Sequence, residues 1–275
     1  MKLCINEATC MKNSSLELDL QLCEKYHYDN IEIRLDMLQD YLKTHTVEDL
    51  QNFFKTSHVK PYAFNSIENI NFCTSEQEQK MLDLFIFACE MGQKINCPYI
   101  IVVPTVSDEM LDRTEDEIFA DSVSMLNLLS DIAMKYSMKI AFEPIGNPRW
   151  CVRELKQCLK IVHAVNRDNV GIALDAFNLF LYNKLENMDT IDLVPAEKIF
   201  VYHINDSEDL PLSILDHCHR LLPGDGVIPL KEISARLKAK GYNSVASIET
   251  FRPAYWKMNP DDVFRMGAEK TRFFL

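Results

Sequence analysis

The feature that most constrains this chain is a regular alternation of short β-rich runs with longer segments of helical periodicity. Eight runs are predicted as strands, at residues 2–6, 30–34, 60–65, 99–103, 139–143, 170–175, 199–205 and 245–249. Eight βα units can form either an open doubly wound sheet or a closed barrel. Because no G-x-G-x-x-G or P-loop motif follows any run, we predict a single (β/α)8 TIM barrel.

Local signals at the ends of the intervening segments support helices there. Ser14 with Glu17 and Thr114 with Glu117 have the spacing of capping boxes, in which a hydroxyl and an acid satisfy backbone N–H groups reciprocally. Gly241 precedes the last predicted strand and is expected to take the left-handed conformation that follows a helix. The chain therefore alternates strand and helix from end to end.

Composition narrows the class of protein. The 275 residues are 47% hydrophobic and show no linker or shift in composition, so one catalytic domain spanning residues 1–275 is expected. The net charge of -12 argues against a nucleic acid partner, since such a protein needs a basic face. The nine cysteines form no C-x-x-C pair and are expected to be reduced thiols in the cytoplasm. With no apolar leader or long apolar run, neither export nor a membrane partner is expected.

Four predicted strands in the second half of the chain end in residues of metal-ligand type, namely Glu143, Asp175, His203 and Glu249. In a (β/α)8 barrel the carboxyl ends of the strands share one rim, so these side chains are expected to converge. Burying three carboxylates together without a cation would carry a large desolvation cost. We therefore predict one divalent metal ion. The oxygen ligands suit Mn or Mg, and the imidazole also suits Zn or Co.

The two glutamates of this set, Glu143 and Glu249, are predicted to be catalytic. One would remove the proton next to the carbonyl of a bound ketone and the other would return one, while the metal stabilises the enediolate oxygen. This chemistry predicts an isomerase acting on a small polyhydroxylated ketone. A lyase is an alternative, because the same enediolate can expel a hydroxyl as water. A non-catalytic sugar-binding barrel is a third hypothesis.

Further residues near these strand ends are candidates for substrate binding. Arg220 offers a rigid cationic fork for substrate oxygens, with a surface salt bridge as the alternative. Arg252 lies just beyond Glu249 and is expected to orient it or to bind substrate, and Trp256 is expected to wall the pocket against water. His217 is interpreted as a solvated loop residue.

Several segments resemble a known family: residues 3–9 (LCINEAT), 28–34 (YDNIEIR), 165–171 (VNRDNVG) and 251–253 (FRP). With the strand-end ligands, they make the chain similar to the xylose-isomerase-like barrels of the sugar phosphate isomerase/epimerase superfamily. More narrowly, they resemble the inosose isomerases of inositol catabolism. The resemblance covers nearly the whole chain. It implies metal-dependent interconversion of ketoinositols, of the 2-keto-myo-inositol to 1-keto-D-chiro-inositol type, with an inosose dehydratase or another ketose epimerase as alternatives.

The resemblance implies that the same four residues bind the metal, that Glu143 and Glu249 exchange the proton, and that Arg220 contacts substrate oxygens. The chain departs from the family at Asn178, where the pattern D-x-x-H usually has histidine. Asn178 can hydrogen-bond a substrate but cannot titrate. A homodimer is a further expectation, because the exposed ends of barrels often support dimers.

The same superfamily includes zinc endonucleases of DNA repair, which use additional histidine ligands. Here the third predicted strand ends at Asn65, the fourth is followed by Pro104, and the sixth by Asn178. With these ligands missing and a net charge of -12, a DNA repair function is not expected.

Overall fold

The computed structural model describes residues 1–106, 112–186 and 188–275. Eight parallel strands close into a barrel, with the order β1-β10-β7-β6-β5-β4-β3-β2. They are β1 (Lys2–Asn6), β2 (Asn30–Arg34), β3 (Lys60–Ile67), β4 (Tyr99–Val102), β5 (Lys139–Phe142), β6 (Val170–Asp175), β7 (Ile199–His203) and β10 (Val245–Ile248). All eight predicted runs are strands of this barrel. The (β/α)8 prediction is confirmed, and the open sheet is excluded because β10 pairs with β1.

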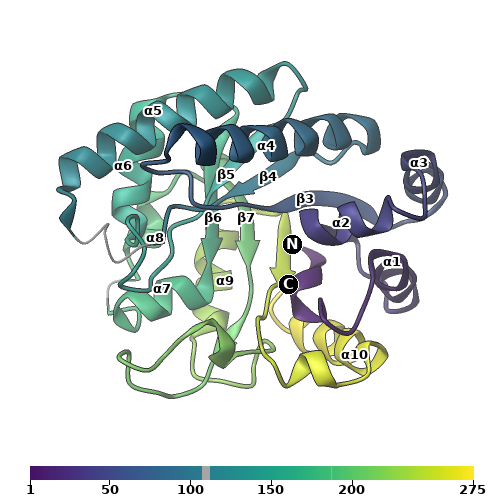
Figure 1. Ribbon diagram of the computed structural model, residues 1–275. Coiled ribbons are helices and arrows are strands. Elements are labelled where there is room, and N and C mark those ends of the chain that lie inside the picture. Colours follow the sequence, from purple (N-terminus) through teal and green to yellow (C-terminus); the bar gives the residue numbers. More distant parts are fainter. Residues whose placement is uncertain (107–111, 187) are drawn as a thin grey trace.

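Helices surround the barrel (Figure 1). They are α1 (Leu16–Lys25), α2 (Leu35–Tyr41), α3 (Val47–Thr56), α4 (Ser75–Ile95), α5 (Glu115–Met134), α6 (Leu155–Val165), α7 (Ala176–Asn183), α8 (Thr190–Leu193), α9 (Leu230–Ala239) and α10 (Pro260–Thr271). A hairpin of β8 (Asp206–Ser207) and β9 (Arg220–Leu221) follows β7. Within the described ranges, no helix combines the length and apolar character needed to cross a membrane.

The helix-end predictions were partly right. Thr114 and Glu117 form the predicted capping box, with the Thr114 hydroxyl accepting the Glu117 N–H at 3.2 Å. Gly241 follows α9 with φ of +87°, also as predicted. The box at Ser14 is wrong, because α1 begins one residue later than that spacing requires. Ser15 is its N-cap and accepts the N–H of Leu18, while the Ser14 hydroxyl contacts a side chain of α1.

The interior of the barrel has an apolar level and a polar level. The apolar side chains belong to Cys4, Tyr62, Ala63, Ile101, Ala141, Ala173, Phe200, Val201 and Val245. Side chains two residues apart in a strand point to the same face. Three predicted ligands each stand two residues after a member of this cluster: Glu143 after Ala141, Asp175 after Ala173 and His203 after Val201. The packed lower level thus supports a polar level at the carboxyl ends of the strands.

A buried acid pair beside β1 makes the stability depend on pH. Glu7 and Asp19 are almost fully buried, and their carboxyl groups contact each other. Burial is the main reason that the pKa of Asp19 rises to about 7, although hydrogen bonds from Ser14 and Glu7 lower it in part. The folded protein therefore keeps a proton that the unfolded chain releases above about pH 4.

We expect the free energy of unfolding to fall as the pH rises from about 4 to about 7, the ordinary and the raised pKa of Asp19. The fall is up to about 1.4 kcal/mol per pH unit for one such proton. Asp19→Asn removes the titrating group. Its free energy of unfolding relative to wild type should therefore be higher at about pH 8 than at about pH 5, measured by urea titration. An identical difference at both pH values would show that Asp19 does not hold this proton.

Candidate metal centre

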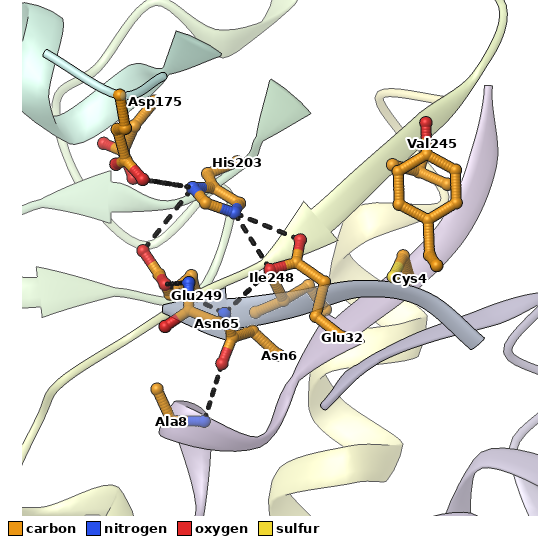
Figure 2. Close-up of polar contacts among 12 residues, drawn as sticks. Cys4, Asn6, Ala8, Glu32, Asn65, Asp175, His203, Val245, Ile248 and Glu249 are labelled. Carbon is orange, nitrogen blue, oxygen red and sulfur yellow. Dashed lines mark hydrogen bonds and ion pairs between the residues drawn. The ribbon is translucent and has the colours of Figure 1, made fainter. Parts of the chain in front are cut away.

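The structure brings the four predicted metal ligands together at the carboxyl ends of β5, β6, β7 and β10. One ligand atom from each of Glu143, Asp175, His203 and Glu249 lies within 4.8 Å of every other, and all four residues are buried. His203 Nδ1 lies 3.6 Å from Glu143 Oε2, 3.7 Å from Asp175 Oδ2 and 3.5 Å from Glu249 Oε2. Figure 2 shows His203 together with Asp175 and Glu249.

These separations fit a shared cation better than direct hydrogen bonds. Ligands bound tetrahedrally about 2.0–2.2 Å from an ion stand about 3.3–3.6 Å from each other. His203 Nδ1 is buried and has no hydrogen-bond partner among the described residues, although three carboxylate oxygens surround it. A buried nitrogen without a hydrogen-bond partner destabilises the fold. A metal ion would give this nitrogen a partner, because an unprotonated imidazole nitrogen binds metals. The donor set therefore fits one divalent cation.

The pKa shifts at the centre also favour a bound cation. The pKa of Glu143 is raised to about 7, mainly by burial and also by the carboxylates of Glu249 and Asp175, although His203 lowers it in part. Burial alone would lower the pKa of His203, but Glu249, Glu32 and Glu143 together hold it well above its ordinary value. The centre thus concentrates negative charge in a region of low dielectric, where a cation is strongly favoured.

Asparagine amides orient the carboxylates. Asn178 Nδ2 donates to Glu143 Oε1 at 2.9 Å. Asn6 and Asn65 donate to Glu249 Oε1 at 2.9 and 3.0 Å. Both glutamates use Oε1 for these bonds, which leaves Oε2 directed toward His203. Asn178 was predicted from the sequence as a substrate contact, whereas no role was predicted for Asn6 or Asn65. Their signal was their position at the carboxyl ends of strands.

A cavity of about 150 Å³ opens above the centre. Glu143 and Glu249 line it, whereas Asp175 and His203 are not among its lining residues. One part of the lining is polar, and includes Asn65, Ser66 and Asn69. Another part is apolar, and includes Val103, Pro104, Ile145, Trp150 and Phe251. Of the four candidate ligands, the two glutamates are therefore the ones placed to meet a bound molecule.

Arg220 also lines the cavity and is buried rather than on the surface. Its Nη1 donates to Glu249 Oε2 at 2.6 Å and lies 3.2 Å from Asp175 Oδ2. Its guanidinium carbon is 5.1 Å from the ring centre of Phe177 and 5.3 Å from that of Phe251. The surface salt bridge considered from the sequence is wrong, because this is a buried ion pair between two rings.

The structure places Arg252 and Trp256 outside the residues that line the cavity. Arg252 pairs with Glu208 at 2.6 Å, and Trp256 donates its indole N–H to the carbonyl of Ala8 at 2.9 Å. Both contacts lie beyond the end of β10, so the structure does not place these two side chains against a molecule bound in the cavity. The Asn178 amide is likewise engaged by Glu143, and Asn178 is not a lining residue.

The interpretation of His217 as a solvated loop residue is wrong. Its ring lies among those of Trp150, Phe177 and Phe251, with centroid distances of 5.7, 6.0 and 5.8 Å, and it lines the cavity. Burial, followed by the charge of Arg220, lowers the pKa of His217 to about 4, so the ring is neutral at physiological pH. These rings come from separate segments of the chain, so no local sequence pattern indicated that they meet.

Comparison with known proteins agrees with this fold. Residues 20–272 match the family described as xylose isomerase-like TIM barrel, and the chain belongs to that family. It is 39% identical to the inosose isomerase of Bacillus velezensis over 272 residues, which is 98% of this chain and 96% of that protein. The inosose isomerase of Bacillus subtilis is also 39% identical, with the same coverage. A crystal structure of the IolI protein with a bound zinc atom has a TM-score of 0.95 and 39% identity, covering 100% of this chain and 98% of that one.

Proposed function

We propose that this protein is a metal-dependent isomerase that interconverts ketoinositols. The observation that carries the proposal is that four metal-type ligands converge beneath a cavity, with two glutamates at its surface. The similarity to inosose isomerases over nearly the full length supports a cyclic polyhydroxylated ketone as substrate. In this proposal the barrel of residues 1–275 is one catalytic domain.

Glu143, Asp175, His203 and Glu249 would hold the ion, and zinc is the first metal to test, because the similar IolI structure contains it. When bound, a divalent ion supplies positive charge that stabilises negative charge developing on substrate oxygens.

Proton transfer is the task of the two glutamates that line the cavity. One of Glu143 and Glu249 takes the proton from the hydroxyl-bearing carbon next to the ketone. The C–H electron pair forms a carbon–carbon double bond, and the proton of the neighbouring hydroxyl moves to the former carbonyl oxygen. The other glutamate, protonated at the start, gives its proton to the former carbonyl carbon, and the neighbouring oxygen becomes the new ketone. Exchange with water then returns both glutamates to their starting protonation states. The ketone has then moved by one carbon without net gain or loss of atoms.

Arg220 and the lining residues would position the ring of the substrate. Arg220 Nε is buried without a hydrogen-bond partner among the described residues, so it can donate to a substrate oxygen. The apolar part of the lining, with Trp150 and Phe251, suits the C–H face of a cyclic polyol, and the amides of Asn65 and Asn69 suit its hydroxyl groups.

Proton NMR of the purified protein with 2-keto-myo-inositol in D2O tests the proposal. We expect an isomeric ketoinositol to appear with the zinc-loaded protein and not after treatment with EDTA, because the negative charge on the reacting oxygens is then uncompensated. A dehydrated diketone would instead support the lyase alternative. A zinc-loaded protein that leaves the ketone unchanged would contradict the proposed substrate.

A small molecule is the proposed partner, and the net charge of -12 supports the absence of nucleic acid. The homodimer and the cytoplasmic location stay predictions. Sedimentation velocity and cell fractionation would test them.

A further inference from the structure

Glu32 is a buried carboxylate for which no role was predicted from the sequence. It lies in the middle of β2 and is 0% exposed. Both of its oxygens are within hydrogen-bonding distance of His203 Nε2, at 3.0 and 3.1 Å. Figure 2 shows Glu32 on the side of the imidazole away from Asp175. A charged group this deeply buried is costly unless its partners satisfy it, and here the main partner is a candidate metal ligand.

A second contact connects Glu32 to Glu249. Asn6 Nδ2 donates to Glu32 Oε2 and to Glu249 Oε1, each at 2.9 Å. Asn6 Oδ1 accepts the backbone N–H of Ala8 at 2.9 Å, which holds the amide with its NH2 group toward both carboxylates. Glu32 therefore contacts one candidate ligand directly and is connected to another through a single side chain.

These contacts determine which nitrogen of His203 is available to an ion. A carboxylate only accepts hydrogen bonds, so the ring nitrogen that faces Glu32 carries the hydrogen. His203 Nδ1 is then the nitrogen left to give its lone pair to an ion, and it is this atom that faces the oxygens of Glu143, Asp175 and Glu249. A carboxylate behind a ligating imidazole also raises the basicity of the ligand.

We propose that Glu32 is a positioning residue of the metal centre, which selects the Nε2–H form of His203 and, through Asn6, orients Glu249. The proposal rests on the metal centre proposed above. It adds a fourth buried carboxylate to Glu143, Asp175 and Glu249, beside the single guanidinium of Arg220, and this excess negative charge strengthens the binding of a cation.

The test is zinc affinity, measured by competition with a chromophoric chelator for wild type, Glu32→Ala and Glu32→Gln. We expect Glu32→Ala to weaken zinc binding by about 10- to 100-fold, the usual effect of removing such a partner. Glu32→Gln should weaken it less, because the amide oxygen still accepts from His203. The absorption spectrum of the cobalt-loaded protein should shift in Glu32→Ala, since the imidazole loses its orientation.

Glu7→Gln is the matched control. Glu7 is also a buried glutamate, just after β1, but it accepts from the backbone of Arg34 and contacts Asp19 rather than a candidate ligand. Its replacement should leave zinc affinity and the cobalt spectrum unchanged. Circular dichroism of the metal-free proteins checks folding. Should Glu32→Ala fail to fold, Glu32→Gln decides the question.

The outcomes separate this inference from the metal centre on which it rests. A wild-type protein that binds no zinc would overturn the metal centre itself. Zinc binding by wild type together with unchanged affinity and cobalt spectra in the folded Glu32 variants would overturn only the role of Glu32. An equal loss of affinity in Glu7→Gln would also overturn it, because any buried carboxylate would then have the same effect.

Discussion

Glu249→Gln is expected to reduce kcat by about a thousandfold or more while the barrel stays folded, within the upper range for loss of a proton-transferring group. Glutamine keeps the shape of the side chain, and its amide oxygen can still accept from Asn6 and Asn65. Its NH2 group would then face the Arg220 guanidinium, which donates to Glu249 Oε2 at 2.6 Å in the wild type. The variant therefore loses a proton carrier, a metal ligand and the negative charge that Arg220 faces.

The measurement is turnover of 2-keto-myo-inositol by NMR, with zinc content determined on the same sample. Glu208→Gln is the control, because Glu208 pairs with Arg252 and is not a cavity residue. It should keep wild-type turnover. Substantial turnover by Glu249→Gln would remove Glu249 from the mechanism.

Arg220→Met is expected to separate substrate use from metal binding. We expect kcat/KM to fall by about a hundredfold or more, since a hydrogen bond to a charged group contributes about 1.5–3 kcal/mol and the buried site also loses the charge itself. Zinc affinity should hold or rise, because a fixed positive charge 3.2 Å from Asp175 Oδ2 and in contact with Glu249 is removed. The metal-free variant should also be less stable by about 3 kcal/mol, since buried carboxylates lose their partner.

Kinetics, chelator competition and urea titration measure the three effects separately. Arg252→Met is a suitable control, because Arg252 is paired with Glu208 away from the cavity. A variant of Arg220 that loses zinc but keeps kcat/KM under saturating metal would contradict the proposed role. It would mean that the guanidinium supports the ligands rather than the substrate.

The four candidate ligands were predictable because their signal is local. Each is an acid or a histidine at the carboxyl end of a buried strand, four successive barrel strands carry one, and in a barrel such positions share one rim. The strand register then sets their height along the barrel axis, with Asp175 opposite His203 in the β6–β7 pair.

The capping prediction at Ser14 failed for a local reason as well. Two consecutive serines, Ser14 and Ser15, can each serve as the N-cap, so the sequence did not determine the first residue of α1.

Glu32 and His217 were not predictable in the same way. Glu32 occurs within a strand rather than at its carboxyl end, and its contact with His203 joins residues 171 positions apart. Asn6 faces Glu32 because β1 and β2 pair with these two residues in register. His217 meets rings from three separate segments of the chain. Such contacts depend on strand register and on where long loops return.

The sequence by itself determined the elements, their order and the chemical type of the strand-end residues, because backbone periodicity and side-chain chemistry act over a few neighbouring positions. Only the tertiary structure decided which polar groups share the interior. Closing β10 onto β1 brings Glu249 to Asn6 and, through it, to Glu32. The physical reason is that a buried charge takes its partners from whatever side chains the closed barrel places beside it, however far apart they lie along the chain.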